Sequence, residues 1–327
     1  MSRHRVLTVF WHSVESDSIR PDYLDGSNPT ASLFREQIRF LVDHYTPISM
    51  SEFLDVASGR RGIRSLPRPP VLLGFDDGFK NVIVNALPIL QEAQIPATFF
   101  VVGEALTRSG FVPWFVELTH LVRKARRTTV TWSSGIVDLA DPGACSTFKR
   151  RFEVAFRACR SQSDREGLLS EISNAVAVPR PQASDLDDDL RFVAKEDLAK
   201  LGVGSLLTIG SHAMTHRHLA ALSRDEQRAE AEMSDAILRE HCPGYCPVIA
   251  YPGGSFNADT LAVVRATYRA GFAVLLGSSY RNPYAYPRMG LGHQTAEELR
   301  YLLSHRRLRY LLPVKRFLHS TGLRSMD

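Results

Sequence analysis

The stretch VLLGFDDG, residues 71–78, decides the fold that the sequence predicts. Its first five residues form an unbroken apolar run, which is typical of a strand covered on both faces, as in a parallel sheet. The run stops abruptly at Asp76 and Asp77. A helical pattern follows at Val82–Ala93, and a second apolar strand, ATFFVVG, covers residues 97–103. This stretch therefore predicts a strand–helix–strand unit with two carboxylates at the end of its first strand.

The same alternation continues outward from this unit in both directions. Strands are expected at residues 6–10, 207–210, 248–251 and 273–276, and helices at 52–57, 225–241 and 259–270. Repeated strand–helix units with buried strands predict an α/β fold, either layered or a barrel. In such barrels the active site lies at the carboxyl ends of the strands, which is where the acidic residues fall.

The segment from approximately 104 to 195 interrupts the alternation of strands and helices. Helical patterns cover residues 114–127, 148–160 and 165–176, and an acidic run spans Asp185–Asp189. The acidic run lacks the glycine and glutamate spacing of a calcium loop, so it is expected to be a solvated linker. We therefore expect a single catalytic domain over residues 1–327, with a mainly helical insertion at approximately 104–195 that forms a lid or a substrate wall.

The composition is that of an ordinary soluble protein, with 44% hydrophobic and 23% charged residues. No apolar stretch reaches the roughly 20 residues of a membrane span. The charged start at residues 1–5 is not followed by a cleavage site of small residues. We therefore expect a first strand there rather than a signal peptide, and a cytoplasmic protein. Four cysteines are too few for a disulfide framework in a chain of 327 residues.

Positive charge, +5 overall, gathers in a basic C-terminal tail at approximately 305–327. Leucines and aromatic residues alternate there with arginines, which is typical of a helix that packs on the domain and exposes a basic face. The same pattern fits a weak peripheral contact with an anionic membrane, at the inner membrane face. Nucleic-acid binding is not predicted, because no motif of a known module accompanies the basic residues.

A pair of histidines forms the second chemical motif. In SHAMTH, residues 211–216, His212 and His216 stand four residues apart, on one helical face or across one turn of a structured loop. Either arrangement lets them share a metal ion, and Asp77 would complete a two-histidine, one-carboxylate set. Such a set accepts one divalent ion, zinc first and otherwise cobalt, manganese or nickel. The alternative is a pair of surface histidines with ordinary hydrogen-bond partners.

Together these residues supply the groups that amide hydrolysis requires. A metal at Asp77 and the two histidines would polarise a carbonyl oxygen and lower the pKa of water towards about 7. Asp76 is then the base that accepts the proton of the water. A donor must also protonate the leaving amine, and His293 is the candidate for that role.

The sequence resembles the polysaccharide deacetylases of carbohydrate esterase family 4, the NodB-homology family, over most of its length outside the insertion. The motifs that carry the resemblance are GFDDG at 74–78, ATFFVVG at 97–103, SHAMTH at 211–216 and AYPGG at 250–254, in the family's order. Trp11-His12 and YPRM at 286–289 also look like the bacterial branch of that family. The resemblance implies a distorted (β/α)7-type barrel and a hydrolase that acts on non-peptide carbon–nitrogen bonds.

The resemblance also implies roles for single residues. It makes Asp76 the base and assigns the metal to Asp77, His212 and His216. It places Tyr251 and Pro252 in the segment whose backbone helps to hold the acetate oxygen.

Two positions depart from the family pattern. The third motif commonly has an arginine two residues before its proline, where it orients the base, but here Ala250 stands there. Arg288 is expected to supply that charge from another strand. GLGH at 290–293 matches the last motif imperfectly, so His293 is either the general acid or a loop residue before a helix.

The predicted function is metal-dependent removal of an N-linked acetyl group from an amino sugar in a glycan or glycan precursor. Two alternatives stay open. The same metal site would serve a deformylase or another hydrolase of non-peptide amides, or the barrel would bind glycans with weakened catalysis. The presence of Asp76 argues against the last alternative, since metal binding alone needs no free carboxylate.

Overall fold

The apolar run at 71–75 forms the strand β3 (Pro70–Phe75), which lies between β1 (Leu7–Trp11) and β4 (Ala97–Val101). The pairings of β3 with both neighbours are parallel. The computed structural model describes residues 6–19, 28–62, 68–132, 135–159, 161–201, 204–274 and 282–303. Every residue of the three strands is buried, as expected for an unbroken apolar run.

One short segment nearly closes the sheet into a barrel. Beyond β4 the sheet continues in parallel through β7 (Leu207–Ser211), β8 (Tyr245–Ala250) and β9 (Ala270–Ala273), and β2 (Thr46–Pro47) adds a short pairing to β3. The two-residue strands β10 (Tyr286–Pro287) and β11 (Met289–Gly290) pair with β9 and β1, respectively. Because only Arg288 separates β10 from β11, this segment bridges both edges of the sheet and nearly closes it. The prediction of a distorted (β/α)7-type barrel is confirmed.

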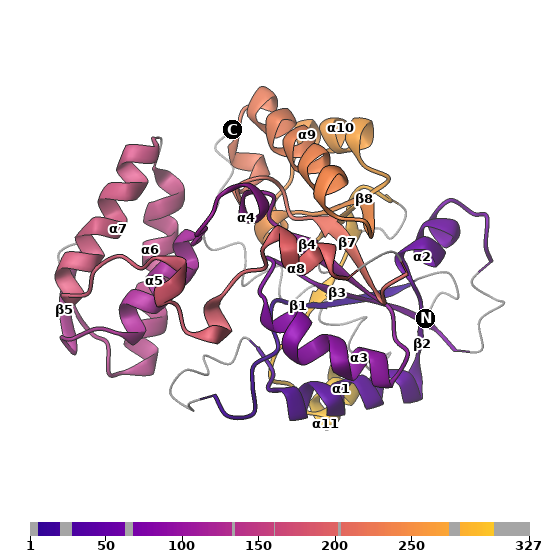
Figure 1. Cartoon of the computed structure of the whole chain (residues 1–327), viewed down its shortest axis with the longest axis horizontal. Coiled ribbons are helices and arrows are strands. Elements are labelled where there is room, and N and C mark those ends of the chain that lie inside the picture. The colour runs from indigo at the N-terminus through magenta and orange to yellow at the C-terminus, as the bar shows by residue number, and fades with distance from the viewer. Residues whose placement is uncertain are drawn as a thin grey trace. The chain divides into compact units, whose positions relative to one another are not determined.

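Helices accompany the strands of the barrel (Figure 1). They include α1 (Ala31–His44), the π-helix η3 (Val82–Ala86) that runs into α3 (Leu87–Glu92), α9 (Arg224–His241), α10 (Ala258–Thr267) and α11 (Ala296–Leu303). The others are α2 (Met50–Ala57), α4 (Glu104–Thr107) and α8 (Lys195–Ala199), with one-turn 3-10 helices at η6 (Leu219–Ala221) and η7 (Pro252–Gly254). A capping box of Ser223 and Glu226 begins α9 by satisfying N–H groups of its first turn.

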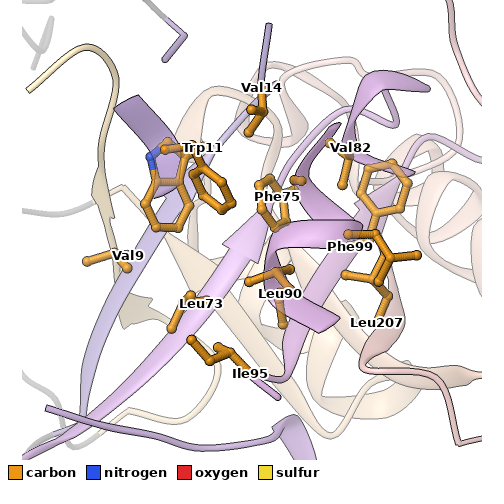
Figure 2. Packing of buried hydrophobic residues seen from close by; sticks show 14 of the residues in the cluster. Val9, Trp11, Val14, Leu73, Phe75, Val82, Leu90, Ile95, Phe99 and Leu207 are labelled. Atoms are coloured by element: carbon orange, nitrogen blue, oxygen red, sulfur yellow. The ribbon is translucent and has the colours of Figure 1, made fainter. Parts of the chain in front are cut away.

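The largest apolar cluster packs between strands and helices (Figure 2). Trp11 and Phe75, from neighbouring strands, stack with ring centroids 5.7 Å apart, and Leu90 of α3 belongs to the same cluster. Successive residues of a strand point to opposite faces. Asp76, one residue after Phe75, is therefore directed to the inner side of the barrel.

Three predicted elements differ from the structure. The strand expected at 273–276 is β9 at Ala270–Ala273, and α10 ends at Thr267 rather than at residue 270. The small residues of β9 gave no strand signal, and Gly271 is required there because a Cβ would lie 2.3 Å from the Tyr251 hydroxyl. The helix expected at Val82–Ala93 begins as a π-helix, since Pro88 has no N–H with which to continue an α-helical bond.

Residues 109–192 form a separate compact unit. It contains α5 (Trp114–Arg123), the antiparallel hairpin β5 (Thr129–Trp132) and β6 (Gly135–Asp138), α6 (Pro142–Ala158) and α7 (Gln162–Val176). These elements enclose their own apolar core, in which Trp132 packs edge-on against Phe148. The helical patterns did not predict the hairpin, although β5 alternates between exposed and buried residues as a half-buried strand does.

The acidic run at 185–189 is not a solvated linker. It follows the 3-10 helix η4 (Ala183–Asp185) and passes into η5 (Asp188–Leu190). Asp187 pairs with Lys124, and Asp189 pairs with Arg123, so opposite charges at the end of α5 hold the run. The helices within the described ranges are each too short or too polar to cross a bilayer. The basic tail at approximately 305–327 lies outside the described residues.

Candidate active site

The two carboxylates at the end of β3 point in different directions because the backbone turns sharply between them. The Asp76 N–H still donates to the Trp11 carbonyl, in continuation of the sheet. Asp77 then takes a left-handed φ of 73°, and its carbonyl accepts from the Val102 N–H at 3.2 Å. A left-handed conformation in a non-glycine residue costs on the order of 1–3 kcal/mol and is concentrated at functional sites.

The histidine motif is a tight loop that follows β7, not a helix. Ala213 and His216 both have left-handed φ values, 62° and 59°. The loop is held from α9 by Glu230, whose Oε2 accepts the N–H groups of Met214 and Thr215 at 2.9 Å each. Glu230 Oε1 accepts the Thr215 hydroxyl. Of the two arrangements that the spacing allowed, the structured loop is the one observed.

This loop brings the three predicted metal ligands together. The Nε2 atoms of His212 and His216 each lie 3.2 Å from Asp77 Oδ1, and one ligand atom from each residue falls within 4.8 Å of the others. The His212 Nδ1 donates to the Ala250 carbonyl at 2.9 Å, which orients the ring so that its Nε2 is directed to Asp77. Ligands about 2 Å from a tetrahedral zinc ion lie roughly 3.3 Å apart, so this set fits such an ion.

Hydrogen bonds keep Asp77 ionised despite its burial. Burial raises the pKa of this carboxyl, but the hydrogen bonds to His212 and His216 outweigh that influence, and its pKa lies well below the usual range. An ionised carboxylate between two imidazoles is the donor set of a divalent-metal site.

Asp76 is paired with the arginine that the sequence proposed for it. Arg288 Nη1 and Nη2 donate to Asp76 Oδ1 and Oδ2 at 2.7 Å each, and both side chains are about 3% exposed. Burial raises the pKa of Asp76, but the charges of Arg288 and His212 outweigh it, so the pKa is lower than usual. The structure thus places a fixed, ionised carboxylate beside the metal-ligand cluster, with Arg288 supplying the positive charge that Ala250 cannot.

His12 acts on this site, although its sequence context predicted no role for it. It follows directly on β1, and its charge lowers the pKa of both Asp76 and Asp77. His293, the predicted proton donor, is instead exposed beyond β11, and its charge acts on Glu298 at the start of α11. The signal that could have identified His12 is its position, the first residue after a buried parallel strand.

The predicted oxyanion residues need a correction. The Tyr251 N–H donates to the Phe272 carbonyl in the sheet, its hydroxyl donates to the Tyr284 carbonyl, and Pro252 has no N–H. The next N–H along the chain belongs to Gly253, which is exposed and has a left-handed φ of 59°. A Cβ at Gly253 would lie 2.2 Å from the His218 ring, so only glycine fits this position.

Comparison with known proteins agrees with this geometry. A family model described as polysaccharide deacetylase matches residues 64–131 and 186–271, which include both aspartates and both ligand histidines. The poly-beta-1,6-N-acetyl-D-glucosamine N-deacetylase of Escherichia coli K12 is 32% identical over 98 residues, which are 30% of this chain. That match spans only 14% of the length of the curated relative.

Solved structures share the fold at low sequence identity. The Streptococcus pyogenes deacetylase PplD, solved in complex with acetate, has a TM-score of 0.57 at 16% identity, covering 91% of this chain and 98% of that one. IcaB from Ammonifex degensii has a TM-score of 0.51 at 16% identity, covering 94% and 95% of the two chains. The ordered motifs, the barrel and the family-model match agree in one result: the chain is similar to the polysaccharide deacetylase family in the residues that carry the site and in its fold.

Proposed function

We propose that this chain removes the acetyl group from the nitrogen of an amino sugar in a glycan or glycan precursor, with one divalent metal ion. The observation that carries the proposal is the convergence of Asp77, His212 and His216 beside the ion pair of Asp76 and Arg288. Metal binding alone would not need this second, ionised carboxylate. The name of the Escherichia coli relative makes a chain of N-acetylglucosamine the first substrate to test.

The protein residues divide the proton transfers of amide hydrolysis between them. Asp76, held in one orientation by Arg288, accepts the proton of the attacking water. His12, which directly follows β1 and whose charge acts on both carboxylates, is the candidate to donate a proton to the leaving nitrogen. The Gly253 N–H is the candidate donor to the acyl oxygen as negative charge develops on it.

A divalent ion bound by Asp77, His212 and His216 supplies Lewis-acid polarisation of the acyl oxygen and activation of water. Zinc is the first candidate, since two imidazoles and a carboxylate suit it, and cobalt, manganese and nickel accept the same ligands.

The two alternatives keep different parts of this site. A deformylase or another amide hydrolase would use the same residues with a different acyl group. A glycan-binding barrel with weakened catalysis is disfavoured by the buried Asp76–Arg288 pair, which orients a base and has no purpose in binding alone. The cytoplasmic location and the membrane contact of the basic tail stay predictions.

The test is acyl release by the purified protein, with its metal content determined. N-acetylglucosamine oligomers, β-1,6-linked ones first, and nucleotide- or lipid-linked N-acetyl sugars are the substrates. Acetate and formate are assayed in parallel, with and without chelation and metal restoration. Metal-dependent acetate release that disappears in Asp76→Asn and His216→Ala would support the proposal. Formate without acetate would favour the deformylase, and glycan binding without release of either acid would favour the weakened barrel.

A further inference from the structure

The buried pair of Asp76 and Arg288 is flanked by two aromatic rings. The Arg288 Cζ lies 4.2 Å from the centroid of the Phe10 ring and 5.2 Å from that of Phe100. Phe10 belongs to β1 and Phe100 to β4, and both are buried. A cation within about 6 Å of a ring centroid is attracted to the ring, most strongly where water is excluded. The guanidinium therefore has a carboxylate along one edge and aromatic rings beside it.

Glycines on strands adjacent to β1 and β4 leave room for these rings. A Cβ at Gly210 of β7 would lie 2.7 Å from Phe100 Cδ1, and one at Gly74 of β3 would lie 3.3 Å from Phe100 Cε2. A Cβ at Gly290 of β11 would lie 3.2 Å from Phe10 Cζ. The 2.7 Å contact is shorter than any that real Cβ atoms make, so no side chain fits at Gly210 while Phe100 stays in place.

The rings matter because little else holds the side chain of Arg288. Its backbone is fixed, since its N–H donates to the Ala273 carbonyl at 2.8 Å. Its Nε, in contrast, has no hydrogen-bond partner among the described residues. Asp76 and the two rings are therefore the contacts that set the plane of the guanidinium.

We propose that Phe10 and Phe100 are positioning residues that hold the Arg288 guanidinium with both Nη atoms aligned to Asp76. Without an aromatic ring on one side, the guanidinium can rotate, and a single N–H then reaches a carboxylate that is no longer fixed. The consequence for catalysis rests on the deacetylase function proposed above, whereas the clamp itself rests on the geometry.

Phe100→Leu tests the clamp, since leucine keeps the site apolar and removes the ring. Phe53→Leu is the matched control, because Phe53 is equally buried and, like Phe100, packs on Phe272, but it is not one of the two rings beside Arg288. We expect Phe100→Leu to lower kcat about tenfold through the lost ring attraction, with KM and metal affinity unchanged. Phe53→Leu should change stability to a similar degree and kcat by less than about twofold.

A double-variant cycle and a spectroscopic signal separate positioning from packing. If Phe100 acts through Arg288, adding Phe100→Leu to Arg288→Lys should lower kcat by less than about twofold further. In ¹⁵N-arginine NMR of the metal-loaded protein, the slowly rotating Nη signals that Arg288→Lys removes should broaden or vanish in Phe100→Leu and persist in Phe53→Leu.

Each outcome bears on one proposal. Unchanged Nη signals in Phe100→Leu, or equal kcat losses in Phe100→Leu and Phe53→Leu, would overturn the clamp. Absence of acyl release from the native protein would overturn the deacetylase, and the NMR signals would still decide whether the rings hold Arg288.

Discussion

Replacing Glu230 should weaken metal binding even though Glu230 is not a ligand. Its carboxylate accepts two backbone N–H groups and one hydroxyl from Met214 and Thr215, the residues between the two ligand histidines. Glu230 is 5% exposed, so little water reaches this position. When the side chain is truncated, the three donors therefore have no alternative acceptor. Glu230→Ala removes all three bonds, whereas Glu230→Gln keeps one acceptor oxygen and removes the charge.

The structure sets the size of the effect. Each buried N–H left unsatisfied costs about 1–3 kcal/mol. Because two N–H groups lose their acceptor, Glu230→Ala destabilises the native conformation of the loop by roughly 2–6 kcal/mol. Ala213 and His216 are held in left-handed conformations that cost on the order of 1–3 kcal/mol each, and the released loop relaxes away from them. Metal binding must then restore the conformation that places His216. We expect affinity for zinc to fall about 10- to 100-fold in Glu230→Ala and by a smaller factor in Glu230→Gln.

Competition with a chromophoric chelator measures zinc affinity without reference to activity. Circular dichroism and urea unfolding establish that each variant is folded. Ser223→Ala is the control, because it removes the cap of the same helix, at a cost of about 1 kcal/mol, without touching the loop. A folded Glu230→Ala protein that binds zinc as tightly as the native chain would refute the reasoning. So would an equal loss of affinity in Ser223→Ala.

Three further predictions concern other parts of the chain. His12→Gln should lower kcat about 10²- to 10⁴-fold with zinc affinity retained, whereas His293→Gln should leave kcat within about twofold, in parallel acetate-release assays. Gly253→Ala should lower kcat about a hundredfold with little change in metal affinity, because its Cβ would overlap a histidine ring and displace the N–H. Burial, opposed by the charge of Asp187, lowers the pKa of His120 below its usual 6.5, so the unfolded chain binds the extra proton. The stability of unit 109–192 should therefore fall as pH drops through about 6.5, and urea unfolding of His120→Gln should show a weaker fall.

The residues of the candidate metal site were predictable because their signals are local. Asp77 follows an apolar strand, and His212 and His216 lie within one six-residue motif, so a single short window contains each part. The parallel arrangement of β3 and β7 then requires their carboxyl ends to meet at the same end of the barrel. The conformation of the histidine loop was not predictable, since it depends on Glu230, which comes from the following helix.

The partners of Asp76 were harder to predict because they depend on barrel closure. Arg288 stands 212 residues after Asp76 and reaches it only because β10 and β11 bridge the two edges of the sheet. His12 is at the opposite end of the chain from Arg288 and enters the same site because β1 pairs with β11. No periodicity in the sequence records that pairing, since each of the two bridging strands has only two residues. His293 lies three residues beyond β11 and is a histidine like His12. It was predicted to be the proton donor because of its place in the order of motifs. The ring of strands, rather than the order of motifs, determines which histidine is close enough for its charge to act on the carboxylates.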